Sequence, residues 1–142
     1  MQRPVFLGGM IREPLAGMRA VCPVPPETAV ARSSPARTID GLIQAAQASD
    51  QAWSARTAIN LPALSTTVGA MAMALEKLGG KAAADLIDWI PDPAVADIVV
   101  NWPSVIDANR ARKLGLLPDP DFESIVADYI RENPRSRTAE LT

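Results

Sequence analysis

The sequence contains no histidine and only one cysteine, Cys22. Without histidine, this chain cannot build a Ser-His-Asp or Cys-His catalytic centre by itself. A single cysteine cannot form an internal disulfide bond, and alone it cannot complete the usual ligand set of a zinc site. We therefore expect a reducing, cytoplasmic setting and no bound metal.

Other absences exclude further classes of protein. The sequence has neither G-x-G-x-x-G nor G-x-x-x-x-G-K-[ST], the glycine-rich loops that hold nucleotide phosphates. No apolar run approaches the roughly 20 residues needed to span a membrane. The formal net charge is −2 and the pI is near 5.1, whereas a nucleic-acid surface needs clustered lysine and arginine. We expect no nucleic-acid partner and no membrane association.

What remains is typical of one globular domain. The chain has 142 residues, of which 48% are hydrophobic, enough to bury a substantial core. We assign residues 1–132 to a single lobe and 133–142 to a polar C-terminal tail. The element pattern predicts an α/β fold of α+β-like character that is mainly helical, with two or three short strands.

Residues 57–80 carry the strongest local pattern. Residues 58–61 favour a short strand, residues 65–67 offer hydroxyl groups for a helix start, and Gly79 or Gly80 can end that helix. Four apolar residues share one face of this helix, because they are spaced by three and four positions: Val68, Met71, Leu75 and Leu78.

The remaining elements are predicted from apolar spacing and helix caps. The segment 19–24 favours a strand and 25–34 a loop. Further helices are expected from Phe6 to Pro14, from Ser34 and Pro35 onward, over 83–90, from Asp92 and Pro93 onward, over 110–114 and over 122–130. The second of these has an apolar stripe formed by Ile39, Leu42, Ile43 and Ala46.

Several segments occur in an order that resembles a known family. They are GGMIREPLAG (8–17) followed by AVCPV, the Ser34-Pro35 helix start, INLPALSTTVGAMAMALEKLGG (59–80), Asp92-Pro93, NWP (101–103), DANRARKLG (107–115) and DFESIVADYI (121–130). In this order they resemble the C-terminal part of an extended short-chain dehydrogenase/reductase, in the NAD-dependent epimerase/dehydratase family. Within that family the likeness is to the D-erythronate dehydrogenase-like group.

The resemblance implies that the catalytic parts of the family lie outside this sequence. Family members bind NAD in an N-terminal Rossmann domain and use a Tyr-x-x-x-Lys pair for proton transfer. The one tyrosine here, Tyr129, is followed four residues later by Asn133, and its position on an apolar helix face favours a packing role. We therefore expect no catalytic residue and no cofactor bound by this chain alone, with NAD belonging to the complete family enzyme.

The resemblance also implies a small sugar-acid-like substrate. Arginine is the residue expected to bind an anion, because its planar guanidinium can donate two parallel hydrogen bonds to a carboxylate. The candidate substrate-binding residues are Arg12, Arg32, Arg37 and Trp102. Surface solvation is the competing interpretation for the arginines, and core packing is the competing interpretation for Trp102.

Two hypotheses for function stay open. The first is a substrate-binding portion of an NAD-dependent oxidoreductase or epimerase that is inactive by itself. The second is a non-catalytic interaction domain that self-associates or pairs with a separate Rossmann subunit, since loss of the Rossmann partner uncovers apolar surface. The helix at Phe6 and the strand at Ile59 are the expected places. The sequence leaves open a truncated enzyme, one half of a split enzyme and a stand-alone domain.

Overall fold

The fold is described from a computed structural model, in residues 6–55 and 57–134. Twelve elements follow one another in this range: α1 (Phe6–Leu15), β1 (Ala20–Cys22), β2 (Ala29–Arg32), α2 (Pro35–Gln47), α3 (Asp50–Trp53), β3 (Leu64–Thr67), α4 (Val68–Gly79), α5 (Lys81–Ala84), β4 (Ile87–Trp89), α6 (Pro93–Val99), α7 (Asn109–Lys113) and α8 (Phe122–Glu132).

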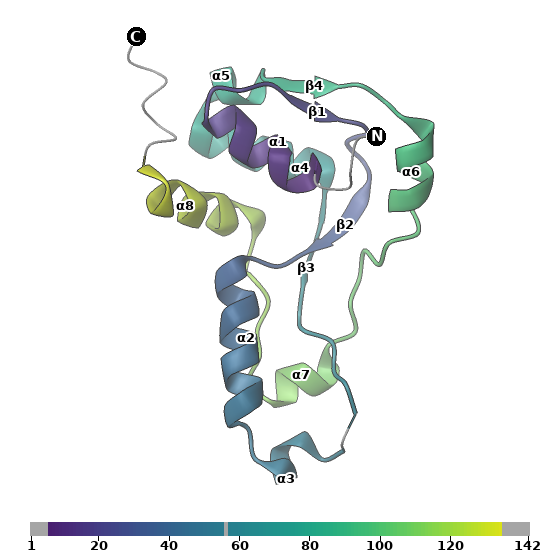
Figure 1. The fold of residues 1–142 in the computed structure, drawn as a ribbon, viewed down its shortest axis with the longest axis vertical. Helices are drawn as coiled ribbons and strands as arrows, with labels where there is room; N and C mark the ends of the chain where they lie inside the picture. The colour runs from purple at the N-terminus through teal and green to yellow at the C-terminus, as the bar shows by residue number, and fades with distance from the viewer. Residues whose placement is uncertain (1–5, 56, 135–142) are drawn as a thin grey trace.

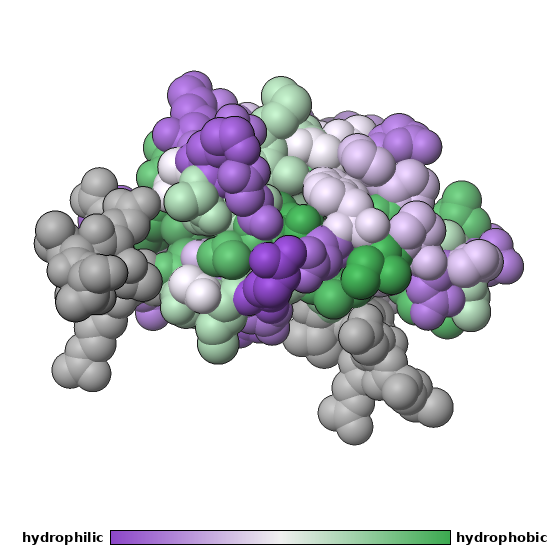
Figure 2. All heavy atoms as spheres, turned by 90° about the horizontal axis from the view of Figure 1, so that it is seen from above, coloured by the Kyte–Doolittle hydropathy of each residue, from purple (hydrophilic) through white to green (hydrophobic). Residues whose placement is uncertain are grey.

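The molecule is elongated and has two unequal parts. The larger part, drawn at the top of Figure 1, gathers α1, α4, α5 and α8 beside the β1–β4 pair, whereas α2, α3 and α7 lie at the other end. Each part has its own apolar cluster. The large cluster includes Met10, Met71 and Leu75, and the small one is built on Ala108, Ala111 and Leu116. From above the larger part, polar and hydrophobic residues are interspersed on the visible face (Figure 2).

The strands form two separate pairs. β1 and β4 pair in parallel, with Ala20 opposite Ile87. β2 and β3 pair antiparallel, with Ala29 opposite Thr67 and Arg32 opposite Leu64. Figure 1 shows this second pair running from the larger part toward the smaller one.

Three local predictions are wrong. Residues 29–32, expected in a loop, form β2, and the strand expected at 58–61 lies instead at 64–67. The helix expected over 83–90 is only the short α5 followed by β4. In each case a pairing with a distant segment decides the local structure, and backbone ladder bonds to that segment are invisible to local periodicity.

The helix α4 agrees closely with its prediction. Thr67 caps it by accepting a hydrogen bond from the Ala70 N–H, and Gly80 follows it with φ of 89°. Val68, Met71 and Leu75 are fully buried, and Leu78 packs against the same cluster. Since this stripe is covered within the chain, it provides no argument that a partner domain is missing.

The helix α2 begins as predicted but faces the opposite way. Ser34 caps it with Pro35 in its first turn, yet the predicted stripe lies outward, with Ile39, Leu42 and Ile43 exposed by 55%, 60% and 50%. The helix packs inward through Gly41, where an added Cβ would lie 2.9 Å from Leu61 Cδ2. This glycine lets the helix approach closely, and its apolar stripe stays uncovered by the described residues.

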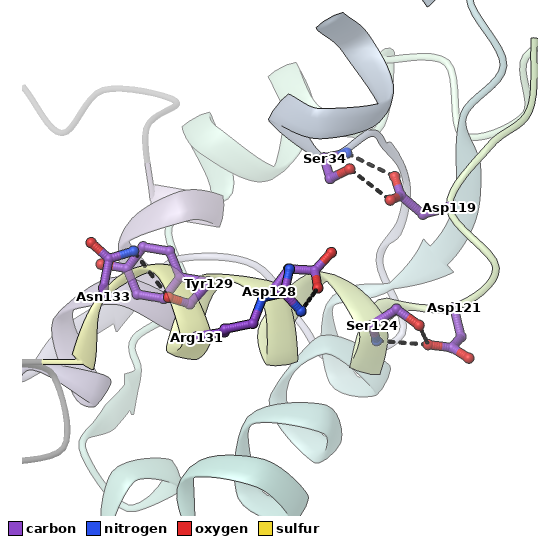
Figure 3. Close-up of polar contacts among 8 residues, drawn as sticks. All are labelled: Ser34, Asp119, Asp121, Ser124, Asp128, Tyr129, Arg131 and Asn133. Atoms are coloured by element: carbon purple, nitrogen blue, oxygen red, sulfur yellow. Dashed lines mark hydrogen bonds and ion pairs between the residues drawn. The ribbon is translucent and has the colours of Figure 1, made fainter. Parts of the chain in front are cut away.

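A buried polar clasp joins the start of α2 to the segment that enters α8. Ser34 donates from its backbone N–H to Asp119 Oδ2 at 2.7 Å and from Oγ to Asp119 Oδ1 at 2.6 Å (Figure 3). Ser34 and Asp119 are only 4% and 5% exposed. Both carboxylate oxygens therefore have a donor, as a buried charge requires.

The fold class is confirmed: the described chain is mixed α/β with more helix than strand. It contains four short strands in that range, where two or three were expected. Among the described residues no helix has the length and hydropathy to cross a membrane. The polar tail predicted at 133–142 lies outside the described residues from 135 onward.

The Ser34–Asp119 clasp predicts a large stability effect from one carboxylate. We expect Asp119→Ala to lower the free energy of unfolding by about 2–3 kcal/mol, because it leaves a buried N–H and a buried hydroxyl without their acceptor. Urea unfolding followed by circular dichroism measures the change. Asp128→Ala is the control, since Asp128 makes an exposed ion pair with Arg131 and should cost less than about 1 kcal/mol. Equal losses in both variants would contradict a special role for the clasp.

Candidate functional site

Among the described basic side chains, Arg32 stands out because burial alone perturbs its pKa. It ends β2, two residues after the buried Val30, so alternation puts both side chains on the same face of the strand. Burial lowers the pKa of the Arg32 guanidinium from its ordinary value. None of the ion pairs or side-chain hydrogen bonds formed within the described residues involves it. A partly desolvated cation of this kind is suited to an external anion.

Arg37 lies in the first turn of α2, on the other side of Ser34. Its backbone N–H donates to Ser34 Oγ at 3.1 Å, and its side chain is half-buried. The N-terminus of a helix favours an anion, but Asp119 already supplies one here through its contacts with Ser34. The N-terminus of α2 is therefore already paired with a carboxylate of this chain.

Arg12 lies apart from this pair, in α1, which packs against β1, α4 and α5. Its guanidinium lies back along the helix over Gly8, where an added Cβ would be 3.4 Å from Arg12 Nη2. Glu13 lies in the same way over Gly9. No Arg12–Glu13 ion pair forms in the described part of the chain, so the two neighbours act separately.

Trp102 lines a cavity of about 500 Å³ between the β1–β2 turn and α6. It is half-buried and also packs against the large apolar cluster. Trp102 therefore both lines a pocket and packs against the core. The cavity includes Ala29 at the start of β2, whereas Arg32 ends the same strand.

The four candidate residues thus fall into three places. Arg32 and Arg37 flank Ser34, Trp102 lines a cavity at the opposite end of β2, and Arg12 lies on α1. No cavity described in this part of the chain contains more than one of them. The strand β2 that separates Arg32 from Trp102 was predicted as loop, which is why their separation was not visible in the sequence.

Two acidic residues gained importance from the structure. Asp119 was not among the candidate residues, and its partner Ser34 lies 85 positions earlier in the sequence. Glu27, in a Pro-Pro-Glu turn, lines the Trp102 cavity together with Asp97. No local pattern marks either pairing, because each depends on chain segments brought together by the fold.

Cys22 and Tyr129 have packing roles and not catalytic ones. Cys22 is 1% exposed, and burial raises the pKa of its thiol, which disfavours the reactive thiolate. Tyr129 packs against the large apolar cluster on α8, as predicted. Among the described residues, no group of three or more histidine, cysteine, aspartate or glutamate side chains is arranged to hold a metal ion.

Comparison with proteins of known sequence finds relatives over most of the chain. A D-erythronate dehydrogenase of Cupriavidus necator is 36% identical over 127 residues, which are 89% of this chain and 39% of the relative. A second D-erythronate dehydrogenase, of Haemophilus influenzae, is 35% identical over 125 residues, 88% of this chain and 40% of the relative. The chain thus spans about two-fifths of the length of the curated relatives it matches. No family model matches the sequence.

Solved structures show the same partial match. A nucleoside-diphosphate-sugar epimerase from Agrobacterium tumefaciens has a TM-score of 0.88 and 32% identity, covering 92% of this chain and 38% of that chain. L-threonine 3-dehydrogenase from Trypanosoma brucei has a TM-score of 0.78 with 21% identity, covering 94% and 40%; this second likeness shows the fold alone. The resemblance identified from the sequence is confirmed by these comparisons.

The burial of the Cys22 thiol can be checked directly by its reactivity. We expect Cys22 in the native chain to react with 5,5′-dithiobis(2-nitrobenzoate) at pH 8 at least about a hundred times more slowly than in urea, because both burial and the raised pKa suppress the thiolate. The absorbance of the released thionitrobenzoate gives the rate. A native rate close to that of the unfolded chain would show that the thiol is accessible and would reopen a nucleophilic role.

Proposed function

Because the chain is related over most of its length to the extended short-chain dehydrogenase/reductases, we propose that it is a substrate-binding portion of an NAD-dependent oxidoreductase acting on a small sugar acid. D-erythronate is the substrate class named for the two curated relatives. In such an enzyme, hydride passes between a substrate carbon and the nicotinamide. The whole reaction is part of the proposal, because the match covers only part of each relative.

The observation that carries the proposal is the half-buried guanidinium of Arg32. A sugar acid presents one carboxylate and several hydroxyl groups, and the carboxylate is the group a guanidinium recognises best. Arg32 has the charge and the partial desolvation that strengthen such a contact. In this proposal Arg37, three residues after Ser34 in the sequence, supplies a second cation.

The chain's own residues would bind and orient the substrate without performing the chemistry. The sequence has no glycine-rich dinucleotide loop and no Tyr-x-x-x-Lys pair, so NAD and the proton-transfer group would belong to a Rossmann domain. Proximity and orientation are a substantial part of catalysis, but they act only when the reacting partner is present. We therefore propose that the chain is silent as a catalyst by itself.

The proposal predicts binding without turnover. With D-erythronate and NAD, the purified chain should produce no NADH absorbance above the buffer rate, yet calorimetry should detect D-erythronate binding. Arg32→Gln should weaken that binding about tenfold or more, because it removes a charge-assisted contact. Arg131→Gln is the matched control, since Arg131 is an exposed arginine on α8.

Each outcome of that experiment tests a separate part. Measurable turnover would contradict the silent chain, and an affinity unchanged by Arg32→Gln would contradict the assigned contact. Absence of any D-erythronate binding would contradict the substrate-binding role itself.

The second candidate function, an interaction domain, is favoured by the outward stripe of α2. Ile39, Leu42 and Ile43 lie on one helix face and are each at least half exposed, and contiguous apolar surface of this kind tends to find a partner. Such surface was expected at Phe6 and Ile59, but both residues are half-buried against the chain's own apolar clusters. The α2 stripe takes their place in the hypothesis.

An interaction role through α2 predicts self-association that depends on the stripe. At high protein concentration, light scattering should give a mass above the 15.1 kDa of one chain. The triple variant Ile39→Gln, Leu42→Gln and Ile43→Gln should return the mass to that of a monomer, because glutamine keeps helix propensity while removing the apolar surface. Val105→Asn is the control, since Val105 is exposed elsewhere. A wild-type chain that stays monomeric would argue against self-association.

A further inference from the structure

The cavity beside Trp102 has a chemistry that the proposed function does not use. It measures about 500 Å³ and lies between the turn that joins β1 to β2 and the C-terminal end of α6. Its lining combines the apolar residues Pro25, Ala29 and Val100 with Glu27, Asp97 and Trp102. A concave apolar site with a few polar groups is the usual form of a small-molecule site.

The ionisable residues that line the cavity, among those described, are both acidic. Among the described residues that line it, Glu27 and Asp97 are the ionisable ones, and none is a lysine or an arginine. Neither carboxylate takes part in an ion pair or side-chain hydrogen bond with another described residue. The two come from different segments, the β1–β2 turn and α6, and both line the same cavity. Two carboxylates in one concavity raise the local concentration of a cation.

Trp102 adds an aromatic wall to this acidic cavity. One part of the residue packs against the large apolar cluster, and another part faces the cavity. Its indole N–H donates no hydrogen bond to a described residue. The face of an indole ring attracts an organic cation through the ring quadrupole, most strongly among the aromatic side chains.

Backbone bonds hold the wall that carries Glu27 in place. The Thr28 N–H donates to the Pro25 carbonyl at 3.1 Å, closing the turn, and the Gly69 N–H donates to the Pro26 carbonyl at 2.7 Å. An added Cβ at Gly69 would lie 3.0 Å from the Pro26 carbonyl oxygen, so the turn lies directly on the start of α4.

The opposite wall is also fixed to the same strand. The Asp92 N–H, at the N-cap of α6, donates to the Pro23 carbonyl at 2.8 Å. Hydrogen bonds therefore anchor the backbone of both walls to the segment that follows β1, residues 23–26. Such preorganisation reduces the entropy lost on binding.

We infer that this cavity binds a small organic ammonium ion. The cationic nitrogen lies between the carboxylates of Glu27 and Asp97 and over the indole of Trp102, while the alkyl groups contact Val100 and Ala29. The site is separate from Arg32, whose charge selects anions, and it does not depend on the sugar-acid proposal. The chain would then hold two ligands of opposite charge at the two ends of β2.

The test uses choline and its uncharged isostere 3,3-dimethyl-1-butanol as probes. Nuclear magnetic resonance follows the indole N–H signal of Trp102 in the full chain, assigned by its disappearance in Trp102→Phe. Ionic strength is kept constant with sodium chloride, because exposed carboxylates are screened by salt. Choline should give a saturable shift with a dissociation constant on the order of millimolar, and the isostere should bind at least about tenfold more weakly.

Variants separate the site from general attraction to an acidic protein. Glu27→Gln and Asp97→Asn keep the side-chain shape, and each should weaken choline binding about tenfold. Asp40→Asn is the control, because Asp40 is an exposed carboxylate on α2, and it should leave the affinity unchanged. The inference is overturned if choline gives no saturable shift, if the isostere binds equally well, or if the two cavity variants behave like the control.

Discussion

The contact between Ser34 and Asp119 is the constraint on which the arrangement of the chain depends. It fixes the N-terminus of α2 to the segment before α8 through two short hydrogen bonds, 85 positions apart in sequence. The large apolar cluster lies on one side of this clasp and the small one near α7 on the other. Because both oxygens of this buried carboxylate accept hydrogen bonds from Ser34, the contact holds the two segments in one relative position. It also supplies a carboxylate to the N-terminus of α2, a position that otherwise favours an external anion.

The two parts of the molecule differ in how completely they cover their apolar residues. In the larger part, α4 is enclosed by α1, α5 and α8, and Val68, Met71 and Leu75 of its stripe are fully buried. In the smaller part, α2 contacts its neighbours through Gly41 and turns its isoleucines and leucine outward. A helix whose apolar stripe faces water is understandable if it evolved against another surface.

Sequence patterns predicted the elements whose signals are local. Ser34 with Pro35, Asp92 with Pro93, and Asp121 mark helix starts by side-chain caps, and all three helices begin there. The strands at 29–32 and 64–67 were missed because each is defined by its partner. The candidate arginines were found from chemistry, whereas their separation from Trp102 required the course of β2. The outward orientation of α2 could not be predicted either, since periodicity locates a stripe but not what covers it.

The central claim is that this chain binds a sugar acid through Arg32, and one measurement tests it most directly. Titration of ¹⁵N-labelled chain with D-erythronate, followed through the arginine side-chain N–H signals, reports which guanidinium meets the carboxylate. The account predicts a saturable shift of the Arg32 signal, with a smaller shift at Arg37 and none at Arg131 on α8. A titration in which the Arg32 signal stays fixed while the other arginines move, or in which none moves, would contradict it.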